Sequence, residues 1–312
     1  MELQQMRYVV AVAETGGFTR AAERCHVVQS ALSHQVARLE KELGSRLFDR
    51  SSRRVRLTAA GAAFLPAARQ ALEAAERARA EVDGVMGKMR GQLTVGAITT
   101  VAAVDLPREL GRFCARYPQV RVGLHVAMSE DLIESVRQGT LDVAFVGLFP
   151  GMRPKGVQLK PLALGELVAI VSPEHPLADQ EQTDLRRLAG ETFIDFPAGS
   201  AARRQREAAF EAAGLTTQTP FEVTDVQLLA KLVRAGLGVG MVPQGVAAEL
   251  SGAHILRVRD APTREELLVW SAFGPSPAAA AFLSQLGSGS GVLPPADGSS
   301  GCPRSPSLSR TM

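Results

Sequence analysis

Residues 18–58 constrain the fold of this chain more than any other stretch. Two short helical patterns lie on either side of a tight break at residues 26–29. The apolar residues of the second pattern recur at steps of four, three and four: Leu32, Val36, Leu39 and Leu43. This spacing predicts an amphipathic helix packed on the preceding one, with Ser30 as its N-cap and Gly44 at its end.

The opposite face of the second helix is polar and basic. It carries Ser30, His34, Arg38 and Lys41, with Ser33 at its edge and Gln29 just before it. Polar and basic residues near the start of a second helix, after a tight turn, are what a reader of the DNA major groove needs. The alternative is an ordinary surface helix with a solvated face.

A basic segment follows, with five arginines against one aspartate within eleven residues: Arg46, Arg50, Arg53, Arg54 and Arg56. The apolar residues between them can anchor a short hairpin, so the segment favours a wing that holds phosphates or a minor groove. A solvated basic loop is the alternative. Residues 1–90 hold 15 basic and 10 acidic side chains, whereas the rest of the chain holds 20 basic and 22 acidic ones. The net positive charge is therefore confined to the N-terminal part.

In this order, the motifs resemble those of LysR-type transcriptional regulators. A helical pattern at residues 3–13 precedes TRAAERCHVVQSALSHQVARLEKELGSRLFDR and RLTAAG, and the likeness extends to about residue 286. It implies a sequence-specific DNA-binding regulator, with a winged helix-turn-helix at 1–58, a linker helix at 59–90 and an effector-binding domain at 91–286. The residues expected at the DNA are Gln29, Ser30, Ser33, His34, Arg38, Arg50, Arg53 and Arg54.

The segment from 58 to 88 is rich in alanine and keeps a three-four spacing: Ala60, Phe64, Ala67, Ala71, Ala74, Ala78, Val82 and Val85. Such spacing predicts a long helix that pairs with a partner helix, with Pro66 as a point of bending. The alternative is a helix folded onto its own domain. The resemblance favours pairing, and hence a homodimer or homotetramer on palindromic double-stranded DNA.

From Gly91 onward, strands alternate with helices. Strand-like segments at 93–95, 120–126 and 141–146 are separated by helical patterns at 101–116 and 130–138, and a similar alternation follows Gly165. This pattern predicts two α/β lobes, the second at about 165–264, with a cleft between them as in periplasmic binding proteins. The resemblance implies that a last strand and a helix at 277–286 return to the first lobe. The tail at 287–312 is rich in Gly, Ser and Pro, and is predicted to be disordered.

Polar residues stand where predicted strands give way to helices, which is where a cleft forms in α/β folds. The residues expected at an effector are Thr99, Thr100, Ser129, Phe149, Gly199 and Ser200. Hydroxyl groups and two helix N-termini favour a small anion. A neutral ligand stays open because no arginine can be placed nearby from the sequence, and plain N-caps or a core role for Phe149 are the alternatives.

No pattern points to catalysis. The five histidines and three cysteines are scattered, and no metal spacing, nucleophile elbow, phosphate loop or dinucleotide motif is present. We therefore expect the protein not to be an enzyme and to hold no metal or cofactor. Two other classes stay open: a small-molecule binding or transport protein, which the two lobes suggest, and an enzyme of the doubly wound class. No signal peptide or apolar run of transmembrane length occurs, which predicts a cytoplasmic protein without a membrane partner; RNA polymerase is a further candidate partner.

Overall fold

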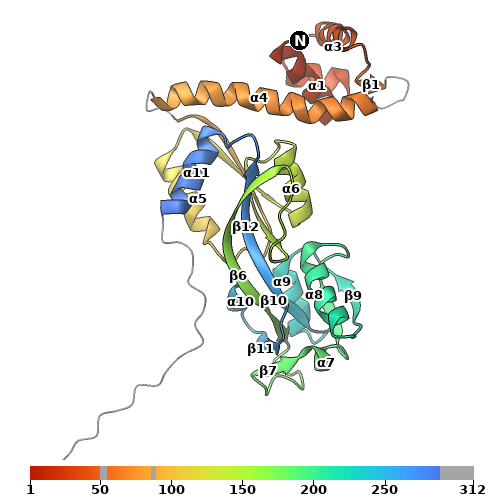
Figure 1. The fold of residues 1–312 in the computed structure, drawn as a ribbon, viewed down its shortest axis with the longest axis vertical. Helices are drawn as coiled ribbons and strands as arrows, with labels where there is room; N and C mark the ends of the chain where they lie inside the picture. Colours follow the sequence, from red (N-terminus) through yellow and green to blue (C-terminus); the bar gives the residue numbers. More distant parts are fainter. Residues whose placement is uncertain (50–54, 86–88, 289–312) are drawn as a thin grey trace, which may run out of the picture.

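The computed structural model describes residues 1–49, 55–85 and 89–288, and it has three parts. A small helical domain lies on one side of a long helix, α4 (Ala59–Val85), and an elongated α/β domain lies on the other side (Figure 1). The wing arginines Arg50, Arg53 and Arg54 and the tail from residue 289 lie outside the described residues.

The N-terminal domain consists of α1 (Leu3–Thr15), α2 (Phe18–Arg24), α3 (Gln29–Leu43) and the short antiparallel strands β1 (Phe48–Asp49) and β2 (Arg56–Leu57). Its core contains the predicted apolar residues Leu32, Val36 and Leu39 of α3. The expected N-cap is wrong, because α3 begins at Gln29. The Val28 carbonyl accepts from the amides of Ala31 and Leu32, so the first turn forms before Ser30.

Helix α4 continues through Pro66 and packs along α1. Arg69 of α4 reaches Glu14 of α1 at 3.2 Å, and it contacts Gln138 of the α/β domain at 3.5 Å. A single side chain thus links the helical domain, the long helix and the α/β domain.

The first lobe contains parallel strands β3 (Gly91–Ala97), β4 (Val120–Val126) and β5 (Val143–Leu148), with β3 between the other two. Its helices are α5 (Leu106–Arg116) and α6 (Ser129–Arg137). Helix α5 begins five residues later than the pattern predicts, because the Asp105 side chain caps it by accepting from the Arg108 amide at 3.0 Å.

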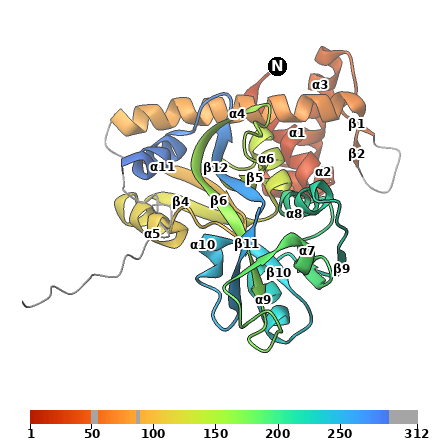
Figure 2. The same cartoon turned by 60° about the horizontal axis from the view of Figure 1, so that its bottom comes forward.

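Two long strands, β6 (Val157–Val171) and β12 (Thr263–Ser271), pair antiparallel and run from the first lobe to the second (Figures 1 and 2). Strand β12 also pairs with β5, which confirms its return to the first lobe. The expected lobe limits at 165 and 264 fall inside these strands, so each strand belongs to both lobes.

The second lobe is built on the far half of β6, which pairs with β10 (Gly240–Pro243) and β11 (His254–Arg259). Strand β7 (Gln182–Asp184) continues this sheet, and β8 (Thr192–Asp195) pairs with β9 (Gln218–Glu222) in a separate parallel ribbon. The helices of this lobe are α7 (Leu185–Leu188), α8 (Ala201–Ala212), α9 (Val226–Arg234) and α10 (Gln244–Ala247). The sequence patterns did not reveal β7, α7, α10 or β11.

The last helix, α11 (Pro277–Ser288), confirms the expected return to the first lobe. Its Phe282 lies edge-on to Phe113 of α5, with ring centroids 5.5 Å apart, and also contacts Phe145 of β5. Each lobe therefore has its own apolar core, and the crossing strands β6 and β12 connect the two. Among the described residues, no helix has both the length and the apolar composition needed to cross a bilayer.

Candidate functional site: a DNA-binding face and an interlobe cavity

Helix α3 presents the predicted polar face to solvent. Gln29, Ser30, His34 and Arg38 are exposed and Ser33 is half-buried, while on the apolar side Leu32, Val36 and Leu39 are buried and Leu43, at the end of the helix, is exposed. The left-handed backbone of His26 (φ 54°) makes the tight turn between α2 and α3. This arrangement leaves the start of α3 accessible along its outer side.

The base of the wing is tied to α3. The buried Glu40 carboxylate accepts hydrogen bonds from the backbone amides of Leu47 (2.8 Å) and Phe48 (3.2 Å). Glu40 therefore fixes where β1 starts relative to α3, and hence where the arginine-rich segment leaves the domain. This carboxylate was missed in the sequence because its spacing suits an ordinary helix surface.

The predicted stripe on α4 divides into two parts. Phe64 packs against the core of the N-terminal domain, as the alternative interpretation of this helix has it. Ala67, Ala74 and Ala78 are exposed, whereas the side chains of Val82 and Val85 lie outside the described set. A small-residue face is thus available along the part of α4 beyond the domain.

A cavity lies between the two lobes, with a volume of about 310 Å³ when its open mouth is counted. Of the expected effector residues, the structure brings Thr99, Thr100, Ser129 and Ser200 to its wall; Gly199 and Phe149 are not part of the lining. The remaining lining residues are Ile98, Met128, Glu130, Gly147, Phe196, Ala201, Ala202 and Arg264.

The polar residues of the first-lobe wall are held by specific contacts. Ser129 Oγ donates to the Gly147 carbonyl at 3.2 Å and lies 3.1 Å from the Gly147 amide, from which it accepts. Thr100 Oγ1 accepts from Arg264 Nη1 at 2.7 Å. Both hydroxyl-bearing residues are buried, so they form a fixed wall.

Arg264 was missed by sequence reasoning. It lies in β12, 164 positions from Thr100, and it precedes the apolar run that suggested the strand. Three charged residues, Arg264, Glu265 and Glu266, enter the strand before that run, and all three are buried. The signal available in the sequence was three consecutive charged residues next to an apolar strand pattern, because charged residues that become buried in a strand are rare unless they are paired.

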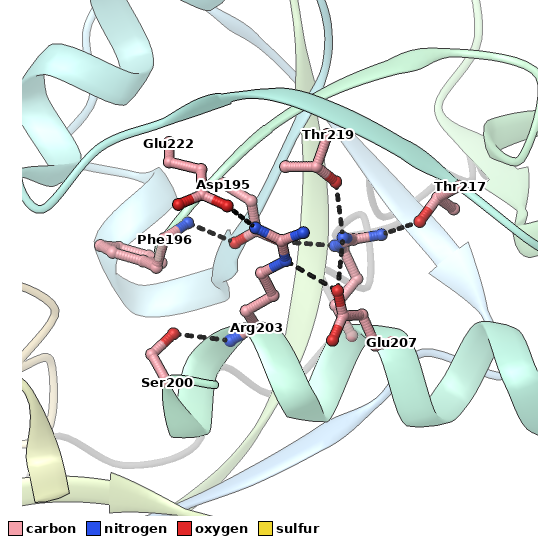
Figure 3. Close-up of polar contacts among 9 residues, drawn as sticks. Asp195, Phe196, Ser200, Arg203, Glu207, Thr217, Thr219 and Glu222 are labelled. Atoms are coloured by element: carbon pink, nitrogen blue, oxygen red, sulfur yellow. Dashed lines mark hydrogen bonds and ion pairs between the residues drawn. The ribbon is translucent and has the colours of Figure 1, made fainter. Parts of the chain in front are cut away.

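A buried ion pair supports the second-lobe wall (Figure 3). Arg206 Nε of α8 lies 2.5 Å from Asp195 Oδ2 of β8, and Arg206 also donates to Thr217 (2.6 Å) and Thr219 (3.0 Å). The other carboxylate oxygen of Asp195 accepts from the Phe196 amide at 2.7 Å. The pair thereby fixes the loop that places Phe196 and Ser200 at the cavity.

Burial raises the pKa of the Asp195 carboxyl, and the charge and hydrogen bond of Arg206 oppose this increase. Figure 3 also shows Arg203, which donates to Glu207 at 2.7 Å and to Glu222. Ser200 caps α8 by accepting from the Arg203 amide at 3.3 Å. For Ser200, the plain N-cap interpretation is therefore correct, although the residue also lines the cavity.

The described residues contain no group of three or more His, Cys, Asp or Glu side chains arranged to hold a metal ion. Cys25 lies in the N-terminal domain and Cys114 on α5, and neither lines the cavity; Cys302 lies outside the described part of the chain. The cavity wall, as described, therefore offers polar and apolar groups for binding but no thiol.

Comparison with known proteins agrees with this arrangement. The description "Bacterial regulatory helix-turn-helix protein, lysR family" matches residues 3–62, and "LysR substrate binding domain" matches residues 87–290. The chain is 33% identical to the Transcriptional dual regulator GltC of Bacillus subtilis (strain 168), over 83% of this chain and 86% of that protein. It is 31% identical to the DNA-binding transcriptional dual regulator OxyR of Escherichia coli (strain K12), over 78% and 79% of the two chains.

Solved structures with the same fold include a full-length OxyR variant from Pseudomonas aeruginosa, with TM-score 0.74, 27% identity and coverage of 94% of this chain and 96% of that one. Another is full-length CbnR in complex with its target DNA, with TM-score 0.63, 28% identity and coverage of 91% and 98%. The matched families and relatives show that the chain is a DNA-binding transcriptional regulator with an effector-binding domain, and not an enzyme. The chain belongs to the LysR family of transcriptional regulators.

Proposed function

We propose that this regulator binds palindromic promoter DNA as a homo-oligomer, with α3 in the major groove and the arginine-rich wing on the flanking backbone. A small metabolite in the interlobe cavity switches its activity, in the cytoplasm. The observation that carries the DNA-binding part is the exposed polar face of α3 beside a wing whose base is fixed by Glu40. CbnR, a relative with the same fold, has been solved with its target DNA.

In the proposed complex, Ser33 and His34 contact base edges near the start of α3, with Gln29, Ser30 and Arg38 beside them. Arg50, Arg53 and Arg54 hold phosphates or a minor groove. Base-edge contacts specify sequence, whereas phosphate contacts contribute affinity that depends on salt. The two groups of residues therefore differ in what their removal changes.

The assembly uses the exposed alanine face of α4. Small side chains let two helices approach closely, and a two-fold dimer presents two α3 helices to two half-sites about one or more helical turns apart. Pairing of α/β domains would extend the dimer to a tetramer, and RNA polymerase is the further partner that such a regulator would contact at a promoter.

The effector part rests on the cavity wall formed by Thr99, Thr100, Ser129 and Ser200 from two lobes. A ligand that contacts both lobes can favour one arrangement of them over another. Such a ligand shifts the equilibrium only by its difference in affinity for the two states, typically about 1–3 kcal/mol. Gly199 and Phe149, outside the wall in this arrangement, would contact the effector only after the lobes move.

The DNA-binding proposal is tested by fluorescence anisotropy with the regulator's own upstream DNA at several salt concentrations. We expect Ser33→Ala and His34→Ala each to cost about 1–3 kcal/mol on the specific site only. Arg50→Ala with Arg53→Ala should weaken binding to all sequences and flatten the salt dependence. The controls are His125→Ala and Arg108→Ala, which change exposed residues of the α/β domain. An unchanged salt slope in the double arginine variant contradicts the wing assignment.

Assembly is tested by light scattering of the full chain. Ala74→Glu and Ala78→Glu place charges on the exposed face of α4 and should produce monomers, whereas Ala115→Glu on the exposed side of α5 should not. For the effector, a metabolite screen by thermal shift is followed by Thr100→Val and Ser129→Ala. If a ligand binds both variants with the affinity it has for the parent, and changes their DNA binding in the same way, the assignment of the effector to this cavity is wrong.

A further inference from the structure

The interlobe cavity contains a buried cation, Arg264, that forms no ion pair with a carboxylate among the described residues. Arg264 is 4% exposed and forms part of the cavity wall. Within the described part of the chain its hydrogen bonds go only to Thr100, from Nη1 to Oγ1 at 2.7 Å and from Nη2 to the carbonyl at 3.4 Å. Its Nε has no acceptor among the described residues. An arginine in the core of a lobe would normally be paired, as Arg206 is with Asp195.

The guanidinium nonetheless keeps its charge. Burial lowers the pKa of Arg264, and the charge of Glu266 acts in the opposite direction, but an arginine remains protonated in proteins. Glu266 does not neutralise it by direct contact, because the Glu266 carboxylate accepts from the amides of Ala102 and Ala103, each at 3.0 Å. A buried charge without a partner is unfavourable, so an anion in the cavity would be stabilised by it.

Two helix N-termini meet the same cavity. Ser129 and Glu130 open α6, whose N-cap residue, Met128, provides no side-chain hydrogen bond. Ala201 and Ala202 open α8 from the other lobe. The first amides of a helix lack intrahelical acceptors and carry partial positive charge. Glu130, the acidic residue of the wall, is held by Arg204 at 2.7 Å.

Gly147 makes room for the guanidinium. A Cβ atom at this position would lie 2.0 Å from Arg264 Nε and 2.3 Å from its Cζ, so any side chain larger than hydrogen would displace the group. The position of the Arg264 guanidinium therefore depends on a glycine at position 147. A Gly147→Ala substitution would shift the guanidinium while leaving its charge in the protein.

Within the proposed effector site, we propose that the ligand is a small organic carboxylate and that Arg264 is the residue that selects it. The guanidinium provides the charge, and the first amides of α6 and α8 provide further donors from both lobes. The apolar side chains of Ile98, Met128 and Phe196 suit a compact carbon body beside the carboxylate.

The test uses the full chain and matched pairs of probes: acetate and acetamide, succinate and succinamide, benzoate and benzamide, each up to about 10 mM in a thermal-shift assay. We expect at least one carboxylate to raise the melting temperature while its amide does not. Arg264→Gln should weaken that carboxylate by about 30-fold or more, because a buried charged partner is lost. Gly147→Ala should weaken it comparably although the arginine is still present, and the exposed Arg259→Gln should change nothing.

A second measurement needs no ligand. If Arg264 serves binding, Arg264→Met removes an unpaired buried charge, and its melting temperature should be no lower than that of the wild type. A clear decrease would mean that the arginine is structural and would overturn the proposal. Equal stabilisation by amides and carboxylates, unchanged affinity in Arg264→Gln, or no response to any carboxylate would overturn it as well. If a neutral ligand bound with an affinity that depends on Ser129 but not on Arg264, the effector site would be supported and the proposal of a carboxylate ligand would be wrong.

Discussion

Glu130 and Arg204 form an ion pair between the two lobes, with Glu130 Oε1 and Arg204 Nη2 2.7 Å apart. Glu130 lies in the first turn of α6, and Arg204 is the fourth residue of α8. The pair therefore links the two helix N-termini that meet at the cavity. Both side chains are partly exposed, which makes this contact one that salt can weaken.

This pair should have a small, salt-dependent coupling energy. A double-mutant cycle with Glu130→Gln and Arg204→Gln, measured by urea unfolding of the full chain, is expected to give about 0.2–1 kcal/mol at low salt and less in 1 M NaCl. The Arg259–Asp184 pair, which lies within the second lobe, is the control. A coupling energy well above about 1 kcal/mol, or one that does not fall in 1 M NaCl, would contradict a solvent-screened ion pair.

The start of α4 is expected to tolerate no side chain at Gly61. A Cβ atom there would lie 2.1 Å from the Leu47 carbonyl oxygen and 2.9 Å from Leu57 Cδ2, beside the base of the wing. Gly61→Ala should lower stability by about 1–3 kcal/mol through overpacking, and weaken DNA binding because the wing moves. Gly111→Ala in α5, where no atom lies within 4 Å, should be neutral or stabilising by up to about 1 kcal/mol. Equal melting temperatures for the two variants would contradict this account.

Removing one partner of the Asp195–Arg206 ion pair should strongly lower the stability of the protein. Asp195→Asn leaves the buried guanidinium without its charge partner, and we expect a loss of about 3–5 kcal/mol in the free energy of unfolding. Asp184→Asn removes the charge from the exposed pair with Arg259 and should cost no more than about 1 kcal/mol. Because Asp195 also holds the Phe196 amide, its loss should reduce effector response as well.

Stability should depend on pH through Glu265. The hydrogen bond from Arg153 lowers the pKa of the Glu265 carboxyl below its ordinary value of 4.5. A carboxyl with a depressed pKa in the folded state stabilises the fold above its ordinary pKa, and this contribution is lost as the pH falls through the depressed value. Arg153→Gln should therefore lower the melting temperature at pH 7, and the difference from wild type should disappear on acidification. The control is Arg108→Gln, and a difference that stays constant with pH would exclude this mechanism.

Local patterns predicted much of the DNA-binding half. The spacing of Leu32, Val36 and Leu39 identified the buried side of α3 because helix periodicity is set within a few residues. The same periodicity placed His34 and Arg38 on the opposite, exposed side. The N-cap of α3 was misplaced by two residues, at Ser30 instead of Val28, because the Val28 carbonyl accepts the first backbone hydrogen bonds and no side-chain cap is formed.

In the α/β half, strands with continuous apolar runs were predictable, whereas short or charged segments were not. β5 is buried along its whole length and was expected, but β7 and β11 were missed because they contain polar and charged residues. The pairing of β11 with β6, and of β7 with β11, compensates for weak local preference. Strand formation depends on partners, which local sequence does not specify.

By itself, the sequence determined the order of domains, the polar face of α3 and four hydroxyl-bearing residues at the ends of strands. Only the tertiary structure decided what surrounds those hydroxyls. Arg264 meets Thr100 because β12 returns to the first lobe and pairs with β5, where Gly147 leaves space for the guanidinium. Such a contact joins segments 164 positions apart, and it follows from strand register rather than from any local preference.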